Sequence, residues 1–130
     1  MILLFTSLIS HSSLSNSFLL KPNKISLTAT PDIYEDDNDF STAKEITINT
    51  IQNRSISSID DEDYVKFVLD TYATIEIETN GTFGDTRMWL FTYIETLLYF
   101  DDDGGSNQFS LISADLLSVG LAVMERSEPE

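Results

Sequence analysis

The sequence predicts an all-β protein, specifically an antiparallel β-sandwich of the jelly-roll-like kind, and three observations carry that prediction. Apolar and polar residues alternate over short stretches, which is the period of a strand with one buried face. Turn-forming residues separate these stretches at intervals of roughly ten residues. No segment sustains the period of a helix, so a fold built from strands alone is expected.

The clearest strand begins at Tyr64. Val65, Phe67 and Leu69 fall on one face of it, and we expect that face to be buried. An acidic turn, Asp60 to Asp63, leads directly into this strand. Four neighbouring carboxylates repel one another unless water, a base or a cation compensates them. The sequence therefore predicts a compensated acidic turn at the start of a core strand.

The segment before this turn is less regular. Asp32 to Phe40 is a first acidic cluster, and Ile46 with Ile48 predicts a short strand. Asn49 to Asn53 is expected to form a loop. Together these pieces predict a loop-rich entry into the sheet.

Later strands follow in a regular order. Thr74 to Thr79 alternates cleanly, with Ile75 and Ile77 inward and glutamates outward, as in an antiparallel strand with one solvated face. Further extended segments are predicted at Arg87–Tyr93, Leu97–Phe100, Phe109–Ile112 and Leu121–Met124. Aromatic residues in strands are more often core than binding face, so we expect core positions for Trp89, Phe91, Tyr93 and Tyr99.

The chain is 130 residues long, which is enough for one domain with a modest core. We divide it into a leader over residues 1–31, a β-sandwich over residues 32–120 and a divergent or truncated end over residues 121–130. The run Met1 to Ile9 is apolar but too short to span a bilayer, and a serine-rich stretch follows. The leader is thus either a secretory signal segment or disordered.

Charge limits the classes of partner. There are 22 acidic residues against 7 basic ones, and all 22 acids lie from Asp32 onward. Nucleic-acid binding is not expected, because affinity for phosphates comes from Lys and Arg. No membrane span is predicted either. The chain has no cysteine, so disulfides and thiolate metal sites are excluded, and a hard cation is a plausible source of added stability.

Catalytic constellations are missing from the sequence. Serine catalysis needs a base, and the single histidine, His11, lies in the leader. No phosphate-binding loop or dinucleotide fingerprint occurs. A carboxylate pair for hydrolysis is compositionally available, although we expect the acids to sit in turns or on outward strand faces. These features predict a protein that is not an enzyme.

Five motifs occur in an order that resembles the bacterial pre-peptidase C-terminal domain. They are Asp32-x-Tyr34-Glu35-x-Asp37-Asn38-x-Phe40-Ser41-x-Ala43, Asp60-x-x-Asp63-Tyr64-x-x-Phe67, Ile75-x-Ile77-Glu78-Thr79, Gly84-Asp85-Thr86-x-x-Trp89-Leu90 and Asp101-Asp102-Asp103-Gly104-Gly105. The resemblance covers about Asp32 to Gly120. That family comprises small jelly-roll-like β-sandwich modules of secreted peptidases, related to the collagen-binding domains of clostridial collagenases.

The resemblance implies a calcium site between the first acidic segment and the acidic turn. The matching positions in this chain are Glu35, Asp37, Asn38, Asp60 and Asp63. Calcium binds six to eight oxygens from carboxylates, amides and carbonyls, which these residue types supply. The chain departs from the family pattern at Ile33 and at Asp36, where a proline is common. Whether Asp101, Asp102 and Asp103 bind a second cation is left open.

The end of the chain departs from the family as well. Members usually continue with a tyrosine-rich strand and at least one more, whereas here Gly120 leads into Leu121 to Met124 and a polar tail. The last strands of the sandwich are therefore expected to be missing or replaced.

The resemblance and the composition together predict a secreted or extracellular, calcium-stabilised, non-catalytic module. Its expected role is ancillary to secreted peptidases, in adhesion, substrate binding or positioning, with a peptidase, an extracellular protein or a polysaccharide as partner. Two alternatives are kept, a small hydrolase that uses the acidic clusters and a non-functional gene fragment.

Overall fold

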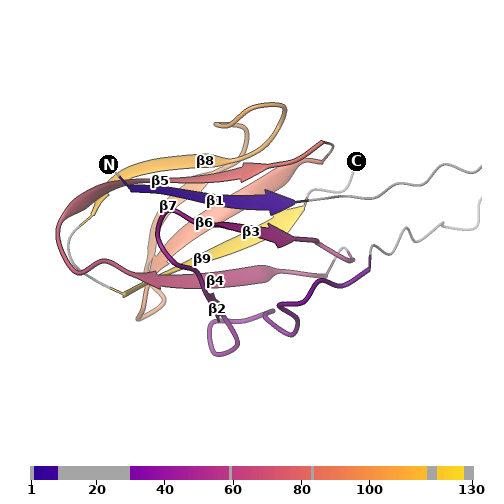
Figure 1. Cartoon of the computed structure of the whole chain (residues 1–130), viewed down its shortest axis with the longest axis horizontal. Helices are drawn as coiled ribbons and strands as arrows, with labels where there is room; N and C mark the ends of the chain where they lie inside the picture. The colour runs from indigo at the N-terminus through magenta and orange to yellow at the C-terminus, as the bar shows by residue number, and fades with distance from the viewer. Residues whose placement is uncertain (1, 9–29, 59, 83, 117–119, 128–130) are drawn as a thin grey trace, which may run out of the picture.

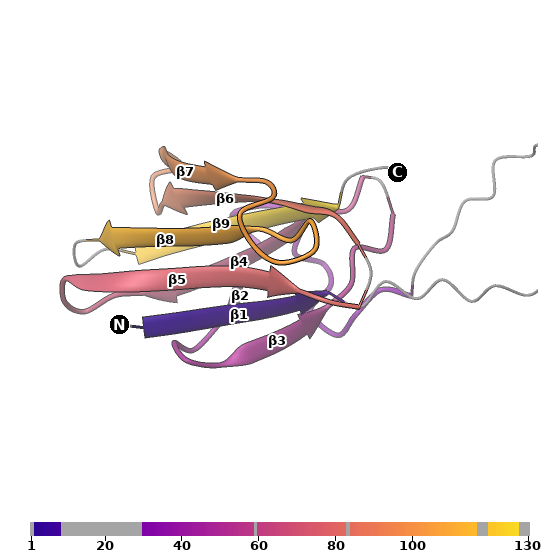
Figure 2. The same cartoon turned by 90° about the horizontal axis from the view of Figure 1, so that it is seen from above.

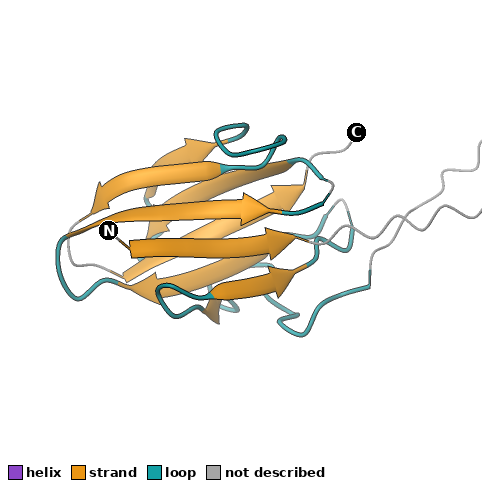
Figure 3. Ribbon diagram, turned by 45° about the horizontal axis from the view of Figure 1, so that its top comes forward, coloured by secondary structure: helices purple, strands orange, loops and turns teal. Residues whose placement is uncertain are grey.

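The computed structural model describes residues 2–8, 30–58, 60–82, 84–116 and 120–127, and within them it contains strands and loops but no helix (Figure 3). The all-β prediction is confirmed. The strands are β1 Ile2–Leu8, β2 Lys44–Glu45, β3 Ile51–Arg54, β4 Asp63–Val68, β5 Ala73–Asn80, β6 Thr86–Thr92, β7 Leu97–Asp101, β8 Leu111–Leu116 and β9 Gly120–Ser127.

These strands form two sheets (Figures 1 and 2). One has the order β3-β1-β5-β8 and the other β2-β4-β9-β6-β7. β1 runs parallel to both of its neighbours, and β2 runs parallel to β4, while the remaining pairs are antiparallel. A jelly-roll-like topology remains a prediction from the sequence.

One hydrophobic cluster joins the two sheets, because each sheet turns alternate side chains toward it. From the first sheet come residues of β5 and β8, and from the second come residues of β4 and β6. Its members are Ile46, Val65, Phe67, Leu69, Ile75, Ile77, Met88, Leu90, Ile112, Ala114 and Leu116. The core thus holds β4 in a fixed register, and the acidic turn that precedes β4 is fixed with it.

The two strands with the clearest alternation were predicted correctly. Val65, Phe67 and Leu69 are buried, whereas Lys66 and Val68 between them are exposed. Ile75 and Ile77 of β5 are also buried. In both strands the period of two directly reflects one face in the core and one facing away from it.

The aromatic residues of β6 and β7 were predicted wrongly as core. Met88 and Leu90 take the inward positions of β6, so Trp89 and Phe91 lie on its opposite face and are only half-buried. Tyr93 and Tyr99 are exposed. Sequence alternation alone does not decide between two faces that both carry large apolar residues.

The entry segment, Asp32 to Asn53, also differs from the prediction. The short strand falls at Lys44–Glu45 rather than over Ile46 and Ile48, although the Ile46 N–H still donates to the Lys66 carbonyl over 2.9 Å. Part of the expected loop at Asn49–Asn53 is strand β3. Its inward residues are Gln52 and Arg54, so the buried face is polar and gives no hydrophobic period.

Both ends of the chain contribute a strand. β1, within the expected leader, lies between β3 and β5, and β9 lies between β4 and β6 (Figure 1). The predicted strand Leu121–Met124 falls within β9. Residues 9–29, which include His11 and most of the expected leader, lie outside the described residues, and the role of residues 1–31 as a signal stays a prediction.

Candidate metal centre

Three carboxylates meet where the entry segment passes the start of β4. Glu35, Asp61 and Asp63 each offer an oxygen, and these oxygens all lie within 4.8 Å of one another. We call this group the inner cluster. Asp61 and Asp63 are 5% and 0% exposed, and Glu35 is half-buried. A group of this kind can hold a metal ion, because hard cations prefer several carboxylate oxygens.

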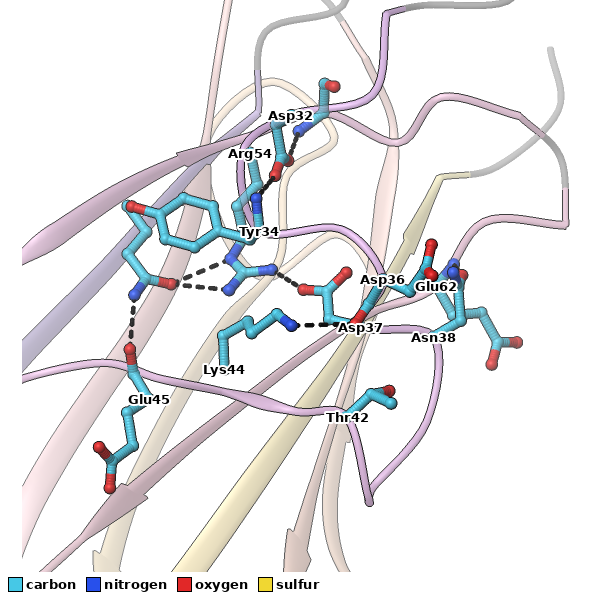
Figure 4. A network of polar contacts seen from close by, with 12 residues as sticks. Asp32, Tyr34, Asp36, Asp37, Asn38, Thr42, Lys44, Glu45, Arg54 and Glu62 are labelled. Carbon is cyan, nitrogen blue, oxygen red and sulfur yellow. Dashed lines mark hydrogen bonds and ion pairs between the residues drawn. The ribbon is translucent and has the colours of Figure 1, made fainter.

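A buried arginine, Arg54, holds the part of the entry segment that carries Glu35, and Figure 4 shows its contact with Asp37. Arg54 of β3 forms an ion pair with Asp37 and donates from Nε and Nη2 to Gln52 Oε1 over 3.0 and 2.9 Å. Its guanidinium also lies 4.4 Å from the centroid of the Tyr34 ring. Since Tyr34 and Asp37 flank Glu35 in the chain, these contacts fix the backbone that carries Glu35.

Backbone contacts tie the same segment to the acidic turn. The Tyr64 N–H donates to the Asp37 carbonyl over 3.0 Å, and the Glu62 N–H donates to Asn38 Oδ1 over 3.0 Å. The Ser57 N–H donates to Asp61 Oδ2. The first two bonds therefore hold the entry segment against the acidic turn, and the third holds Asp61 against Ser57.

Electrostatic strain concentrates at Glu35. Burial, together with the negative charges of Asp61 and Asp37, raises the pKa of Glu35 from 4.5 to about 7. Burial also raises the pKa of Asp37, although its hydrogen bond to Arg54 opposes that shift. Glu35 Oε1 and Asp37 Oδ1 are buried without a hydrogen-bond partner among the described residues. A bound cation would reverse the shift of Glu35, because it stabilises the ionised form.

The cluster opens onto a pocket of about 290 Å³. Two members of the inner cluster, Glu35 and Asp61, contribute to its wall. The full lining is Pro31, Glu35, Asp36, Asn38, Ser57, Ser58, Asp60 and Asp61. Because most of these residues carry side-chain oxygens, an ion entering from solvent meets oxygen donors along its path.

The structure brings some of the predicted ligands together and separates others. Glu35 and Asp63 meet in the inner cluster, as the family resemblance implied. Asp37 points instead to Arg54, while Asn38 and Asp60 line the pocket. Asp37 and Asp61 lie in loops, as expected, but both are buried, and Asp63 is buried at the first position of β4 rather than on an outward strand face.

Asp61 was not among the predicted ligands, although it belongs to the inner cluster. A signal for it was present, because Asp61, Asp63 and Val65 are two residues apart and a period of two places all three on the inward side. No such signal exists for the pair formed by Asp37 and Arg54, which are distant in sequence and join only through the fold.

A second acidic group combines the residue just before β6 with two residues just after β7. Asp85, Asp102 and Asp103 bring their carboxylate oxygens within 4.8 Å of one another, and we call them the loop cluster. Arg87 Nε lies 3.4 Å from Asp102 Oδ2. Asp101 instead uses its carboxylate locally, where Oδ2 accepts from the N–H groups of Gly104 and Leu111 over 2.9 and 2.8 Å. Two members of the predicted run therefore join Asp85, and the third stabilises the loop.

A scan against protein-family models finds no match, and searches of curated proteins and of solved structures find none either. The resemblance to the pre-peptidase C-terminal domain accordingly stays a prediction from the quoted motifs. Within the described ranges, no helix has the length and hydropathy needed to cross a membrane.

Proposed function

We propose that this protein is a non-catalytic, extracellular binding module whose fold is stabilised by calcium at the inner cluster. The observation that carries the proposal is the meeting of Glu35, Asp61 and Asp63 oxygens within 4.8 Å, next to a pocket with further oxygen donors. The nearby Arg54 pairs with Asp37 rather than with a cluster member. A divalent cation would supply the positive charge that these carboxylates need.

The mixture of donors favours calcium over magnesium. Calcium accepts six to eight oxygens in flexible geometry, whereas magnesium requires near-octahedral coordination and keeps several waters. The three carboxylates of the cluster can be supplemented by the amide of Asn38, the carboxylate of Asp60 and hydroxyls at the pocket wall. This set is rich in oxygens and irregular in type, which suits calcium.

Calcium at this place would join two parts of the chain. Glu35 belongs to the entry segment, while Asp61 and Asp63 belong to the turn and to β4. An ion shared by both would neutralise repulsion and hold the entry segment against the second sheet. Stability would then rise with calcium concentration, because the ion binds the folded state only.

The role in binding or positioning rests on the motifs and on the charge of the chain. The resemblance to modules of secreted peptidases supports an extracellular location and a peptidase, extracellular protein or polysaccharide as partner. The strongly acidic composition also suits a solvated module in a calcium-rich environment.

Isothermal titration calorimetry with calcium tests the proposal. The full chain should bind calcium at one site, magnesium should bind more weakly, and Asp63→Asn should remove the calcium signal. Glu76→Gln, on the face of β5 opposite its buried isoleucines, is the matched control and should bind as the parent does. Absence of binding by the parent, or equal loss in both variants, would reject the inner cluster as a specific site.

One observation favours a second candidate, a small hydrolase. Glu35 has a raised pKa near 7 and faces a pocket together with Asp61, which is an arrangement that general acids use. A screen with peptide, ester and glycoside substrates separates the candidates. Turnover that disappears in Glu35→Gln and is inhibited by calcium would favour the hydrolase, whereas absence of turnover together with calcium binding favours the module.

A further inference from the structure

Exposed apolar side chains concentrate on the hairpin formed by β6 and β7, at its turn and along β7. Tyr93 is 73% exposed, Ile94 66% and Leu97 51%, and the three following residues are also exposed. Phe100 packs one face on Trp89, with ring centroids 5.1 Å apart, yet it remains 50% exposed. A group of exposed large apolar side chains this close together is typical of an interaction site.

The backbone of the same hairpin offers a sheet edge. β7 is one of the two outermost strands of its sheet, and within the described part of the chain it pairs only with β6. All four residues from Leu97 to Phe100 are exposed and uncharged. Natural edge strands are usually protected by charges or prolines within the strand, because an open edge can pair with another strand. β7 carries neither before its last residue, Asp101, although its pairing with β6 shifts register between the partners of Leu97 and Tyr99.

Negative charge stands at both ends of this edge. Glu95 lies in the turn before β7, and Asp102 and Asp103 follow it. Asp103 is exposed, and the Asp102 side chain is 38% exposed. The hairpin from Tyr93 to Asp103 itself contains no Lys or Arg, and the nearest described base is Arg87, beside Asp102. A partner that covers the edge would therefore meet carboxylates before and after the apolar stretch.

We propose that the β7 edge binds an extended, basic polypeptide segment, which adds to the sheet as a further strand. Its backbone would pair with Leu97–Phe100, its apolar side chains would contact Leu97 and Phe100, and its Lys or Arg residues would lie near Glu95 and Asp103. Main-chain hydrogen bonds then supply affinity, and the charges supply selectivity. This inference goes beyond the proposed function and does not depend on calcium at the inner cluster, since β9 and β6 separate β7 from β4.

The negative charge of the chain favours a basic peptide, rather than a second copy of the protein, as the partner of the β7 edge. The net charge is −15, and two copies paired edge to edge along β7 would bring like charges together at both ends. An anionic lipid surface would meet the same repulsion. A basic strand removes that repulsion and covers the apolar edge at the same time.

Binding of a labelled peptide to the full chain in calcium tests this inference. The probe is a fluorescent peptide of about ten residues, long enough to cover the edge, with an alternating valine and threonine core between lysine pairs. It should bind the parent, and rising salt should weaken the binding because exposed charges are screened. A peptide with glutamate in place of lysine should not bind, nor should one with prolines that remove alternate backbone donors.

Two protein variants locate the binding. Leu97→Lys introduces a positive charge at the edge, which repels the lysines of the peptide. It should weaken binding of the lysine peptide about tenfold or more, which is about 1.4 kcal/mol. Ile51→Lys is the matched control, because Ile51 is 62% exposed on β3, the edge strand of the other sheet, and it should leave binding unchanged. Glu95→Gln combined with Asp103→Asn should weaken binding without changing the edge.

Several outcomes would overturn the inference. The first are failure of the folded parent to bind the lysine peptide, equal loss of binding in Leu97→Lys and Ile51→Lys, and binding of the proline peptide as tight as that of the lysine peptide. Parent dimers in sedimentation that dissociate in Leu97→Lys would point to a second copy instead. Binding to anionic vesicles but not to the peptide would point to a lipid surface. Thermal melts of each variant confirm folding before any result is compared. The assay contains calcium throughout. A peptide that does not bind therefore says nothing against calcium binding at the inner cluster, which calorimetry measures separately.

Discussion

The two acidic clusters have the same number of carboxylates but opposite surroundings. The inner cluster is mostly buried and lies beside an arginine that is itself inside the protein. The loop cluster is partly solvated, and its arginine, Arg87, is 45% exposed. Buried charges interact strongly and cost free energy when they lose a partner, whereas exposed charges are screened by water and salt. Burial, rather than the count of acids, therefore decides where a cation has the larger effect on stability.

The largest expected effect comes from removing the side chain of Arg54. Arg54→Ala leaves Asp37 buried without its ion pair and should lower the free energy of unfolding by about 3–5 kcal/mol. Arg87→Ala should change it by less than about 1 kcal/mol, because that pair is exposed. Urea unfolding of both variants measures the contrast. Similar losses in the two variants would show that burial does not separate the clusters.

Calcium removal should produce the next largest effect. At calcium concentrations about 100 times the dissociation constant, binding contributes about 2.7 kcal/mol, so chelation should lower Tm by roughly 10 °C. Asp63→Asn should abolish this response and should also raise Tm in chelator, since it removes one of the crowded charges. Asp103→Asn should keep the response. A parent melt that is the same with calcium and with chelator contradicts the prediction.

The neighbouring residues Asp60 and Asp61 sharpen the assignment of ligands. Asp61→Asn should weaken calcium binding about tenfold or more, because this residue belongs to the inner cluster. Asp60→Asn should have a smaller effect, since Asp60 is exposed and only lines the pocket. Calorimetry on the two variants distinguishes them. The reverse order would support the ligand set implied by the family resemblance.

A pH series should separate Glu35 from the rest. In chelator, the folded protein holds the Glu35 proton up to about pH 7, whereas the unfolded chain releases it near 4.5. The folded state binds more protons between these values, so stability contributed by Glu35 is full below the lower value and lost as pH rises through about 7.

Melts between pH 4 and 8 measure this effect. Glu35→Gln should remove the fall in Tm that extends toward pH 7, and saturating calcium should do the same in the parent. Burial and Asp103 also raise the pKa of Asp85 in the loop cluster, and burial raises the pKa of Asp37, so a part of the slope should survive in Glu35→Gln. An unchanged pH profile in Glu35→Gln would rule out Glu35 as the group responsible.

The smallest effect is expected at the loop cluster. Asp103→Asn, at an exposed position, should change the free energy of unfolding by no more than about 0.5 kcal/mol, with or without calcium. Chemical denaturation in both conditions measures it. A calcium-dependent loss of stability in this variant would show that the loop cluster also holds an ion and would weaken the comparison.

The local alternation of apolar and polar residues predicted some strands of this structure and not others. β4 and β5 were readable from the sequence, because buried apolar residues alternate with more exposed ones over Val65–Leu69 and around Ile75 and Ile77. β3 was not, since its inward residues are Gln52 and Arg54 and their burial depends on Asp37, which comes from another segment. The cluster position of Asp61 was readable in principle from its spacing to Asp63. The aromatic residues of β6 show the limit, because both faces of that strand are apolar.

The position of β9 has a consequence for the timing of folding. β4 and β6 do not touch as neighbours in their sheet, because β9 lies between them and pairs with both. During synthesis this sheet cannot close until Gly120–Ser127 have left the ribosome. Contacts between residues far apart in sequence make folding slow, since the chain loses loop entropy before they form. The half-formed sheet would expose two edges in the meantime, and chaperones that shield strand edges would raise the yield of folded protein.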